Sequence, residues 1–279
     1  MLELWITDLK SKEKAFDVPG SVGSWEFQQR EDYLEILQKI QEGQCAPTYY
    51  AANAAVDHSI SDADFIAATD ELIDSCLILS FLSGACVTPR GSTQASTLQF
   101  AQLGDAFIRP RAIAGVDPLL ISGSYGQYFS KGMPAIRAAM LPRRLRLFLS
   151  HWISGLTCFS LEDLFLSLGV QMDIVKQCEI AAAGTKIDYF PGMQAASARY
   201  GLTPLTRDYK DMRNDIVHEG RLSGTNFPSK TKAQCASVIV DTLNWIDLYV
   251  CAVLGLGTPP ARWRLHDLQH GLPALSLAQ

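Results

Sequence analysis

The sequence predicts a mainly α-helical protein in two parts, an N-terminal α+β module and a C-terminal antiparallel helical bundle. Two observations lead to this fold class. After Pro134, five successive segments carry apolar residues at helical spacing with short connections. The pattern differs over residues 87–121, where the stretch 97–103 alternates with a period of two. The 279 residues, 48% of them hydrophobic, suffice for one large or two modest domains. We place the module at 1–130, the bundle at 134–257 and a C-terminal arm at 258–279.

The N-terminal module begins with a short apolar segment and a turn at Pro19 and Gly20, followed by a predicted helix over 29–42. Its clearest helix starts after Ser61, a good N-cap residue, and ends at Gly84. Because Pro110 interrupts the period-two pattern that follows, this pattern predicts short edge strands or extended loops.

Glycine and proline then mark a predicted linker between the two parts. Glycine frees the backbone and proline removes an N–H donor, so their clustering is typical of loops. The residues concerned are Gly123, Gly126, Gly132 and Pro134.

The C-terminal part is predicted to hold five helices. Their expected limits are 143–156, 160–183 with Ser160 and Asp163 as a capping box, 191–200, a helix capped by Thr206 and ended by Gly220, and 229–254. Apolar periodicity selects their shared core. The expected core residues are Leu145, Phe148, Leu164, Leu168, Val175, Ile216, Ile239, Leu243 and Ile246.

Charge is distributed unevenly along the chain. Residues 1–117 hold 17 acids and 8 bases, a balance of −9, whereas residues 118–279 hold 12 acids and 16 bases, a balance of +4. A basic patch is typical of nucleic-acid binding, although the same arginines would also suit a solvated helix start. The expected RNA-binding residues are Lys131, Arg137, Arg143, Arg144 and Arg146.

Cysteine usage favours a reducing compartment. The seven cysteines form no Cys-x-x-Cys pair, and Cys76, Cys178, Cys235 and Cys251 fall in apolar helical patterns, where a thiol acts as a small hydrophobe. No signal peptide is apparent at the N-terminus. The most apolar stretch, 238–256, carries two aspartates and an asparagine, which are costly in lipid. We therefore expect a cytoplasmic protein without membrane association.

The most informative segment is Tyr209–Gly220, which reads as the last turns of a helix. Asn214 and His218 are four residues apart and share one helix face, with Arg213 adjacent. Arginine is a good phosphate binder, and histidine side chains in general titrate near neutrality. The two side chains together suit the cleavage of a phosphodiester bond. Met212, Ile216 and Val217 are expected to dock this helix.

The spacing Arg-x4-His with a polar residue directly after the arginine resembles the signature of the HEPN (higher eukaryotes and prokaryotes nucleotide-binding) family. The form Arg-Asn-Asp-Ile-Val-His-Glu-Gly at 213–220 is closest to its ApeA-like subgroup. The stretches 160–168 and 173–179 are similar to the acid-bearing helix that precedes the motif there. The resemblance covers about 134–257 and implies a small helical bundle, a dimer with two motifs facing one groove, and in many members a metal-independent ribonuclease.

For such a ribonuclease, His218 would transfer protons, Arg213 would stabilise the phosphorane charge, and Asn214 would orient either His218 or a phosphate oxygen. Glu179 would pair with Arg213 or hold His218, although it could equally be a surface residue beside Lys176. In the alternative interpretation, Arg213 and His218 form helix-end ion pairs with Asp211 or Asp215. Asp215 and Glu219 are otherwise expected to be solvated.

The leading hypothesis is therefore a metal-independent endoribonuclease that acts on RNA and leaves 2′,3′-cyclic phosphate ends, and the resemblance implies a role as a toxin or antiviral defence effector. It would work as a homodimer and without a cofactor, and an antitoxin or regulatory protein is a further expected partner. The alternative is a non-catalytic HEPN-like dimer that binds nucleotide, RNA or protein. His266 and His270 lie four residues apart but have no third metal ligand nearby, so no metal site is predicted.

Overall fold

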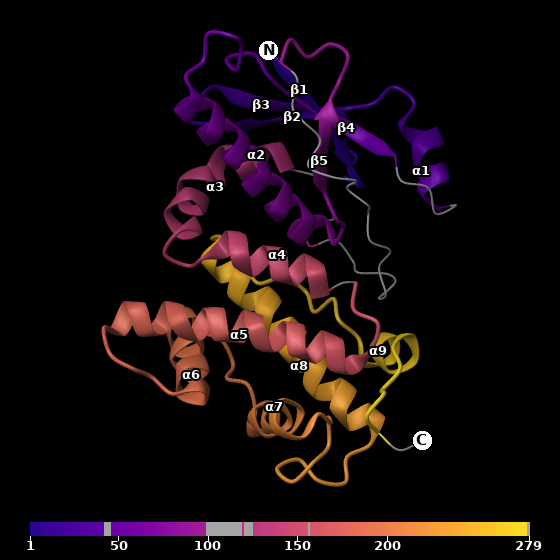
Figure 1. The fold of residues 1–279 in the computed structure, drawn as a ribbon, viewed down its shortest axis with the longest axis vertical. Coiled ribbons are helices and arrows are strands. Elements are labelled where there is room, and N and C mark those ends of the chain that lie inside the picture. The colour runs from indigo at the N-terminus through magenta and orange to yellow at the C-terminus, as the bar shows by residue number, and fades with distance from the viewer. Residues whose placement is uncertain (42–45, 99–118, 120–124, 156, 278–279) are drawn as a thin grey trace. The chain divides into compact units, whose positions relative to one another are not determined.

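The computed structural model describes residues 1–41, 46–98, 119, 125–155 and 157–277. These residues divide into two compact units, one ending at Pro134 and the other beginning at Ala135. The first unit contains a sheet with helices, and every element of the second is a helix (Figure 1). The chain is therefore an α+β protein rich in helix.

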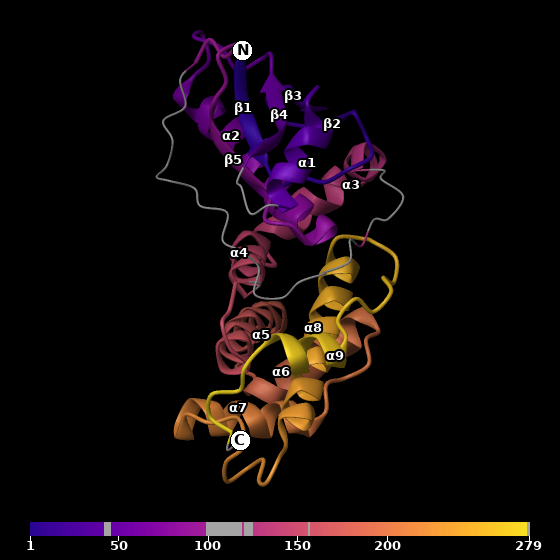
Figure 2. The same ribbon diagram turned by 90° about the vertical axis from the view of Figure 1, so that its right-hand side faces the viewer.

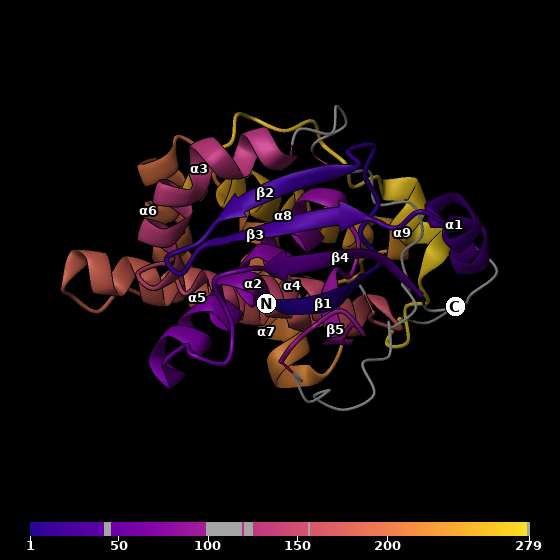
Figure 3. The same ribbon diagram turned by 90° about the horizontal axis from the view of Figure 1, so that it is seen from above.

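The first unit contains a five-stranded antiparallel sheet of order β2-β3-β4-β1-β5, visible side by side in Figure 3. Its strands are β1 (Leu2–Thr7), β2 (Ala15–Pro19), β3 (Ser24–Gln29), β4 (Pro47–Asn53) and β5 (Thr88–Ser92). Successive side chains of β1 point to opposite faces of the sheet. Leu2, Leu4 and Ile6 are buried on one face, and Glu3 and Trp5 are partly exposed on the other.

Helix α2 (Asp62–Ser83) packs on the buried face, where the indole N–H of Trp25 donates to the carbonyl of Ala68 at 3.1 Å. Its predicted caps are confirmed. The Ser61 hydroxyl accepts from the amide of Asp64, and Gly84 adopts the left-handed conformation with φ of 64°.

The N-terminal prediction was wrong in detail. The helix expected from residue 29 is α1 (Tyr33–Gln41), because Gln29 belongs to β3 and its side-chain amide donates to the Tyr49 hydroxyl. Four of the five strands lie within the first 53 residues. Of the segment 87–121, where strands were expected, β5 confirms one, and residues 99–118, 120 and 121 lie outside the described residues.

The predicted linker is also wrong, because α3 (Tyr125–Met140) runs through Gly126, Gly132 and Pro134. Gly123 lies outside the described residues. A buried stripe explains the helix, since Tyr125, Phe129, Met133 and Ile136 recur at helical spacing. Pro134 itself is exposed. Burial of the opposite face therefore outweighs the hydrogen bond that proline removes from a helix interior.

The second unit is built around α5 and α8, which contact α6 and α7 and each other. Its helices are α4 (Leu145–Gly155), α5 (Leu161–Ala183), α6 (Tyr189–Tyr200), α7 (Arg207–Glu219), α8 (Lys232–Val253) and α9 (Leu265–Gly271). All nine predicted core side chains are buried. The expected N-caps Ser160 and Thr206 are confirmed, the former accepting from the amide of Asp163. The six described cysteines are free thiols, and the four expected in helical cores are buried.

The C-terminal arm packs on the second unit through α9 and the residues before it. Figure 2 shows α9 lying along α8, in agreement with their contacts. The Arg262 guanidinium forms a two-pronged pair with the Asp247 carboxylate at 2.7 and 2.8 Å, and the Trp263 indole donates to the same carboxylate at 2.7 Å.

Helix α8 alone among the described helices is long and apolar enough to cross a membrane, but 67% of that window is buried within the protein. The helix also carries Asp247, whose buried carboxylate accepts hydrogen bonds from Arg262 and Trp263 of the C-terminal arm. The helix therefore has the character of a core helix.

Candidate functional site

Helix α7 presents a buried stripe and an outer face. Tyr209, Met212, Asp215 and Ile216 are buried and follow the helical repeat. Burial of Met212 and Ile216 was predicted correctly, whereas Val217 is half exposed and does not dock the helix. This division determines which residues of the motif face solvent.

Arg213 is held by its neighbours from two other helices. Its guanidinium lies 4.0 Å over the Tyr189 ring of α6, and its Nη2 approaches the Asp173 carboxylate of α5 at 3.4 Å. The side chain keeps 23% of its surface exposed. The aromatic face restricts the orientation of the guanidinium, while the long ion pair to a half-exposed carboxylate is weak, so an anion could replace Asp173.

A buried tyrosine pair supports this arginine. Tyr189 stacks on Tyr209, which lies one turn before Arg213 on α7, with ring centroids 6.1 Å apart, and their hydroxyls share a short hydrogen bond. Burial raises the pKa of Tyr189 to about 12, although the Tyr209 hydroxyl and the Arg213 charge act in the opposite direction. Both phenols are therefore neutral at physiological pH and serve as a platform.

His218 and Asn214 lie on the outer side of α7, one turn apart. His218 is exposed in the last turn, and Gly220 ends the helix in the left-handed conformation, with φ of 70° and its N–H bonded to the Ile216 carbonyl. Within the described residues neither side chain hydrogen-bonds to Arg213. Asn214 is partly exposed. The imidazole and the amide thus remain accessible to a ligand.

Asp215 is buried, which corrects the expectation that it is solvated. Its carboxylate accepts from the backbone amides of Gly224, Asn226 and Phe227 at 2.8, 2.9 and 2.7 Å, and from the Asn226 side chain at 2.7 Å. Burial acts to raise the pKa of Asp215, but these donors outweigh it and the pKa lies below its usual value. Asp215 therefore fixes the loop after the motif to α7.

Glu219, the other acid of the motif, is exposed and accepts from the Thr225 amide at 3.0 Å and from Arg221. A Cβ added at Gly224 would meet the Glu219 carboxylate at 2.6 Å and the Asp215 side chain at 2.9 Å, so a larger residue here would displace these two acids. The loop residues thus converge on the two acids of the motif.

We expect Asp215→Asn to lower the free energy of unfolding by about 2–4 kcal/mol, since an amide oxygen replaces one acceptor and its NH₂ meets backbone donors. Because the folded pKa is lowered, the wild-type advantage should be complete above the unfolded value of ~3.9 and vanish as the pH falls through the folded value. Urea unfolding at several pH values measures this. The exposed control Glu219→Gln should change stability far less, and equal losses would contradict a special role for Asp215.

Glu179 is the main correction to the predicted site. It is neither beside Arg213 nor on the surface but 2% exposed, and it binds Arg143 at 3.1 Å and Arg199 at 2.9 Å. Residues 173 and 179 lie about 240° apart around one helix at 3.6 residues per turn, so only one can face α7. That residue is Asp173. The missed signal was this angular difference.

The predicted basic residues do not share one environment. Arg143 is bound to Glu179 and lies 5.4 Å over the Tyr200 ring, so it holds α5 and α6 in place. Lys131 belongs to the first unit, whereas Arg137, Arg144 and Arg146 are exposed residues of the second. The exposed position of Arg144 leaves its charge within reach of a polyanion.

Among the described residues, no group of three His, Cys, Asp or Glu side chains is arranged to hold a metal ion. His266 and His270 on α9 pair their rings at 4.6 Å without a third ligand in that part of the chain. Comparison with known proteins finds no matching family model, no similar curated protein and no similar solved structure.

Proposed function

We propose that the second unit is a HEPN-type, metal-independent endoribonuclease whose reaction centre consists of Arg213, Asn214 and His218. The observation that carries the proposal is the setting of Arg213, which is oriented on Tyr189, weakly paired with Asp173 and partly open to solvent. A group needed only to stabilise the fold would be expected to find a stronger partner. Arg262, with two short bonds to Asp247, is such a case in the same unit.

RNA carries its own nucleophile, so the protein needs to move two protons and stabilise one charge. His218 would take the proton of the ribose 2′-hydroxyl, whose oxygen bonds to phosphorus while the bond to the 5′-oxygen breaks. Arg213 would bind the equatorial oxygens of the phosphorane through its planar fork. His218 of a second copy would protonate the leaving 5′-oxygen, and Asn214 would position a phosphate oxygen.

The rival proposal is a non-catalytic dimer that binds nucleotide, RNA or a protein. The weak contact between Arg213 and Asp173 is also compatible with this rival, because a guanidinium that an anion can free from Asp173 would bind a phosphate without catalysing a reaction. Under the ribonuclease proposal the protein would act as a toxin or antiviral defence effector, with an antitoxin or regulatory protein as a partner.

The test is cleavage of a mixed RNA pool by the full chain, with and without EDTA, followed by end-group analysis. We expect cleavage that is insensitive to EDTA and leaves 2′,3′-cyclic phosphate and 5′-hydroxyl ends. Loss of cleavage in EDTA, or 5′-phosphate products, would overturn the mechanism. Absence of cleavage together with RNA binding would favour the rival.

Composite catalysis also predicts a homodimer in which α7 and its copy face each other. Sedimentation equilibrium should give twice the monomer mass, and Asn214→Glu should weaken the dimer because two new carboxylates repel across the groove. The control Asp267→Asn lies on α9, away from the motif, and should leave the dimer intact. A monomer at all concentrations would rule out the composite site.

A further inference from the structure

The sheet of the first unit has a second face that carries an ordered pattern of aromatic and acidic residues. In the register of the sheet, Trp5 of β1 opposes Tyr50 of β4, and Tyr50 opposes Gln28 of β3. One repeat further along, Glu3 opposes Ala52 and Ala52 opposes Glu26. An aromatic row therefore lies beside an acidic row, about 7 Å apart by strand geometry.

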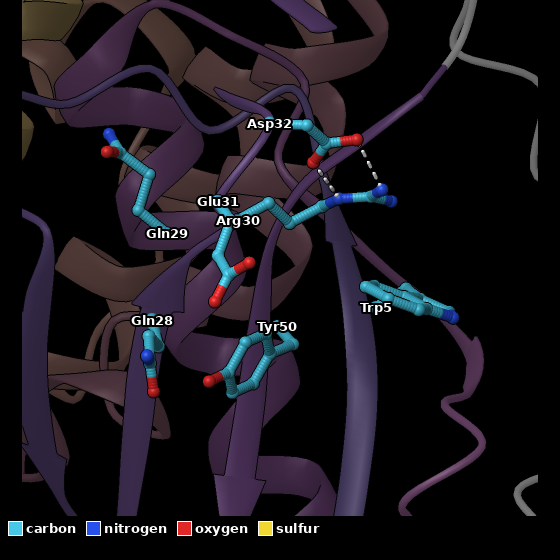
Figure 4. Close-up of a pocket in the computed structure, with 7 residues that line it drawn as sticks. All are labelled: Trp5, Gln28, Gln29, Arg30, Glu31, Asp32 and Tyr50. Atoms are coloured by element: carbon cyan, nitrogen blue, oxygen red, sulfur yellow. Dashed lines mark hydrogen bonds and ion pairs between the residues drawn. The ribbon is translucent and has the colours of Figure 1, made fainter. Parts of the chain in front are cut away.

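Two hollows lie on this face. The first, of about 390 Å³, is lined by Trp5, Gln28, Tyr50 and the turn after β3, including Arg30 and Glu31 (Figure 4). The second, of about 370 Å³, is lined by residues around Ala52. The small side chain of Ala52 leaves space between Glu3 and Glu26.

The first hollow already shows how this surface binds a cation. The Arg30 guanidinium lies 4.9 Å over the Trp5 ring and is neutralised by Asp32 through two bonds of 2.8 Å. Glu31 has no such partner among the described residues. Figure 4 shows its carboxylate on the Tyr50 side of the pocket, and the pKa of Tyr50 is raised by burial and by Glu3, Glu26 and Glu31.

The second hollow is lined by the carboxylates of Asp17 and Glu26 together with Met1, whose N-terminal ammonium donates to the Thr97 hydroxyl. Glu26 opposes Asp17 of β2, and neither carboxylate has an ion pair within the described residues. Like charges directly opposite each other destabilise a sheet, so a cationic ligand would relieve a cost present in the free protein. The N-terminal balance of −9 over residues 1–117 adds a long-range attraction for the same ligand.

We propose that this face binds an extended basic peptide of a partner protein, with arginine or lysine at alternate positions. Side chains two residues apart in an extended peptide are about 7 Å apart and match the spacing of the two rows. One cationic side chain would lie on the Tyr50 ring beside Glu31, and the next would reach Glu26 and Asp17. A single small cation could fill only one hollow.

The probe is a short fluorescent peptide in which arginine alternates with threonine, titrated with the full chain and followed by fluorescence anisotropy. The matched peptide carries neutral citrulline in place of arginine. We expect binding of the arginine peptide alone. Glu31→Gln and Glu26→Gln should each weaken it by roughly tenfold, the usual value of a charge-assisted hydrogen bond.

Two further variants separate this site from general attraction to an acidic surface. Asp62→Asn removes an equal charge from the exposed start of α2 and should leave affinity within about twofold. Tyr50→Phe keeps the aromatic face and should bind normally, whereas Tyr50→Leu should lose about threefold. Equal effects of Glu31→Gln and Asp62→Asn, binding of the citrulline peptide, or no binding at all would overturn the proposal.

Discussion

The variant His218→Ala should cleave RNA about 10²–10⁴-fold more slowly than the wild type, the usual contribution of general acid–base catalysis. The fold should persist, because His218 is exposed and makes no hydrogen bond among the described residues. Initial cleavage rates on one RNA, with thermal melting as the check on folding, measure both effects. His266→Ala is the matched control, since it removes an exposed histidine from α9.

Arg213→Lys extends the same prediction to the charge-stabilising group. Lysine keeps the charge but loses the planar fork and its stacking on Tyr189, so the loss of rate should approach that of Arg213→Ala. If His218→Ala cleaved as fast as His266→Ala, the proposed site would be wrong. Rescue by lysine would reduce Arg213 to a source of positive charge.

The variant Arg262→Met should lower the free energy of unfolding by about 3–5 kcal/mol, because it leaves the Asp247 carboxylate buried without its cation. The two side chains are 1% and 3% exposed. The guanidinium also lies 4.9 Å over the Trp152 ring, so the arm would lose packing as well as charge. Urea unfolding with a constant slope in denaturant measures the change.

Two further variants give this prediction its controls. Arg262→Met combined with Asp247→Asn should recover part of the loss, since the amide is neutral and its oxygen can still accept from Trp263. Arg207→Met breaks an exposed pair with Asp211 and should cost less than about 1 kcal/mol. Equal costs for Arg262→Met and Arg207→Met would show that the arm does not stabilise the second unit.

The helices of the second unit were predictable because their information is local. Apolar residues at helical spacing, Ser160 at an N-cap and Gly220 at a C-cap act within one or two turns. The first unit was harder to predict. The alternation of Leu2, Leu4 and Ile6 is a strand signal, but the pairing partners lie up to about fifty residues away in β4 and up to 88 residues away in β5, as in the pair of Leu4 and Ser92. Glycine and proline predicted a loop around Pro134, but a helix forms there because burial of one helix face outweighs these local preferences.

The sequence by itself determined the helices after Pro134, their core and the placing of Arg213, Asn214 and His218 at one helix end. Only the tertiary structure decided which partner each acidic side chain binds. Glu179 joins Arg143 and Arg199, Asp173 meets Arg213, and Asp215 holds a loop. The physical reason is that the hydrophobic periodicity that predicts a helix lies within a single segment of the sequence. An ion pair instead depends on which faces of separate helices meet, and this packing is a property of the whole unit.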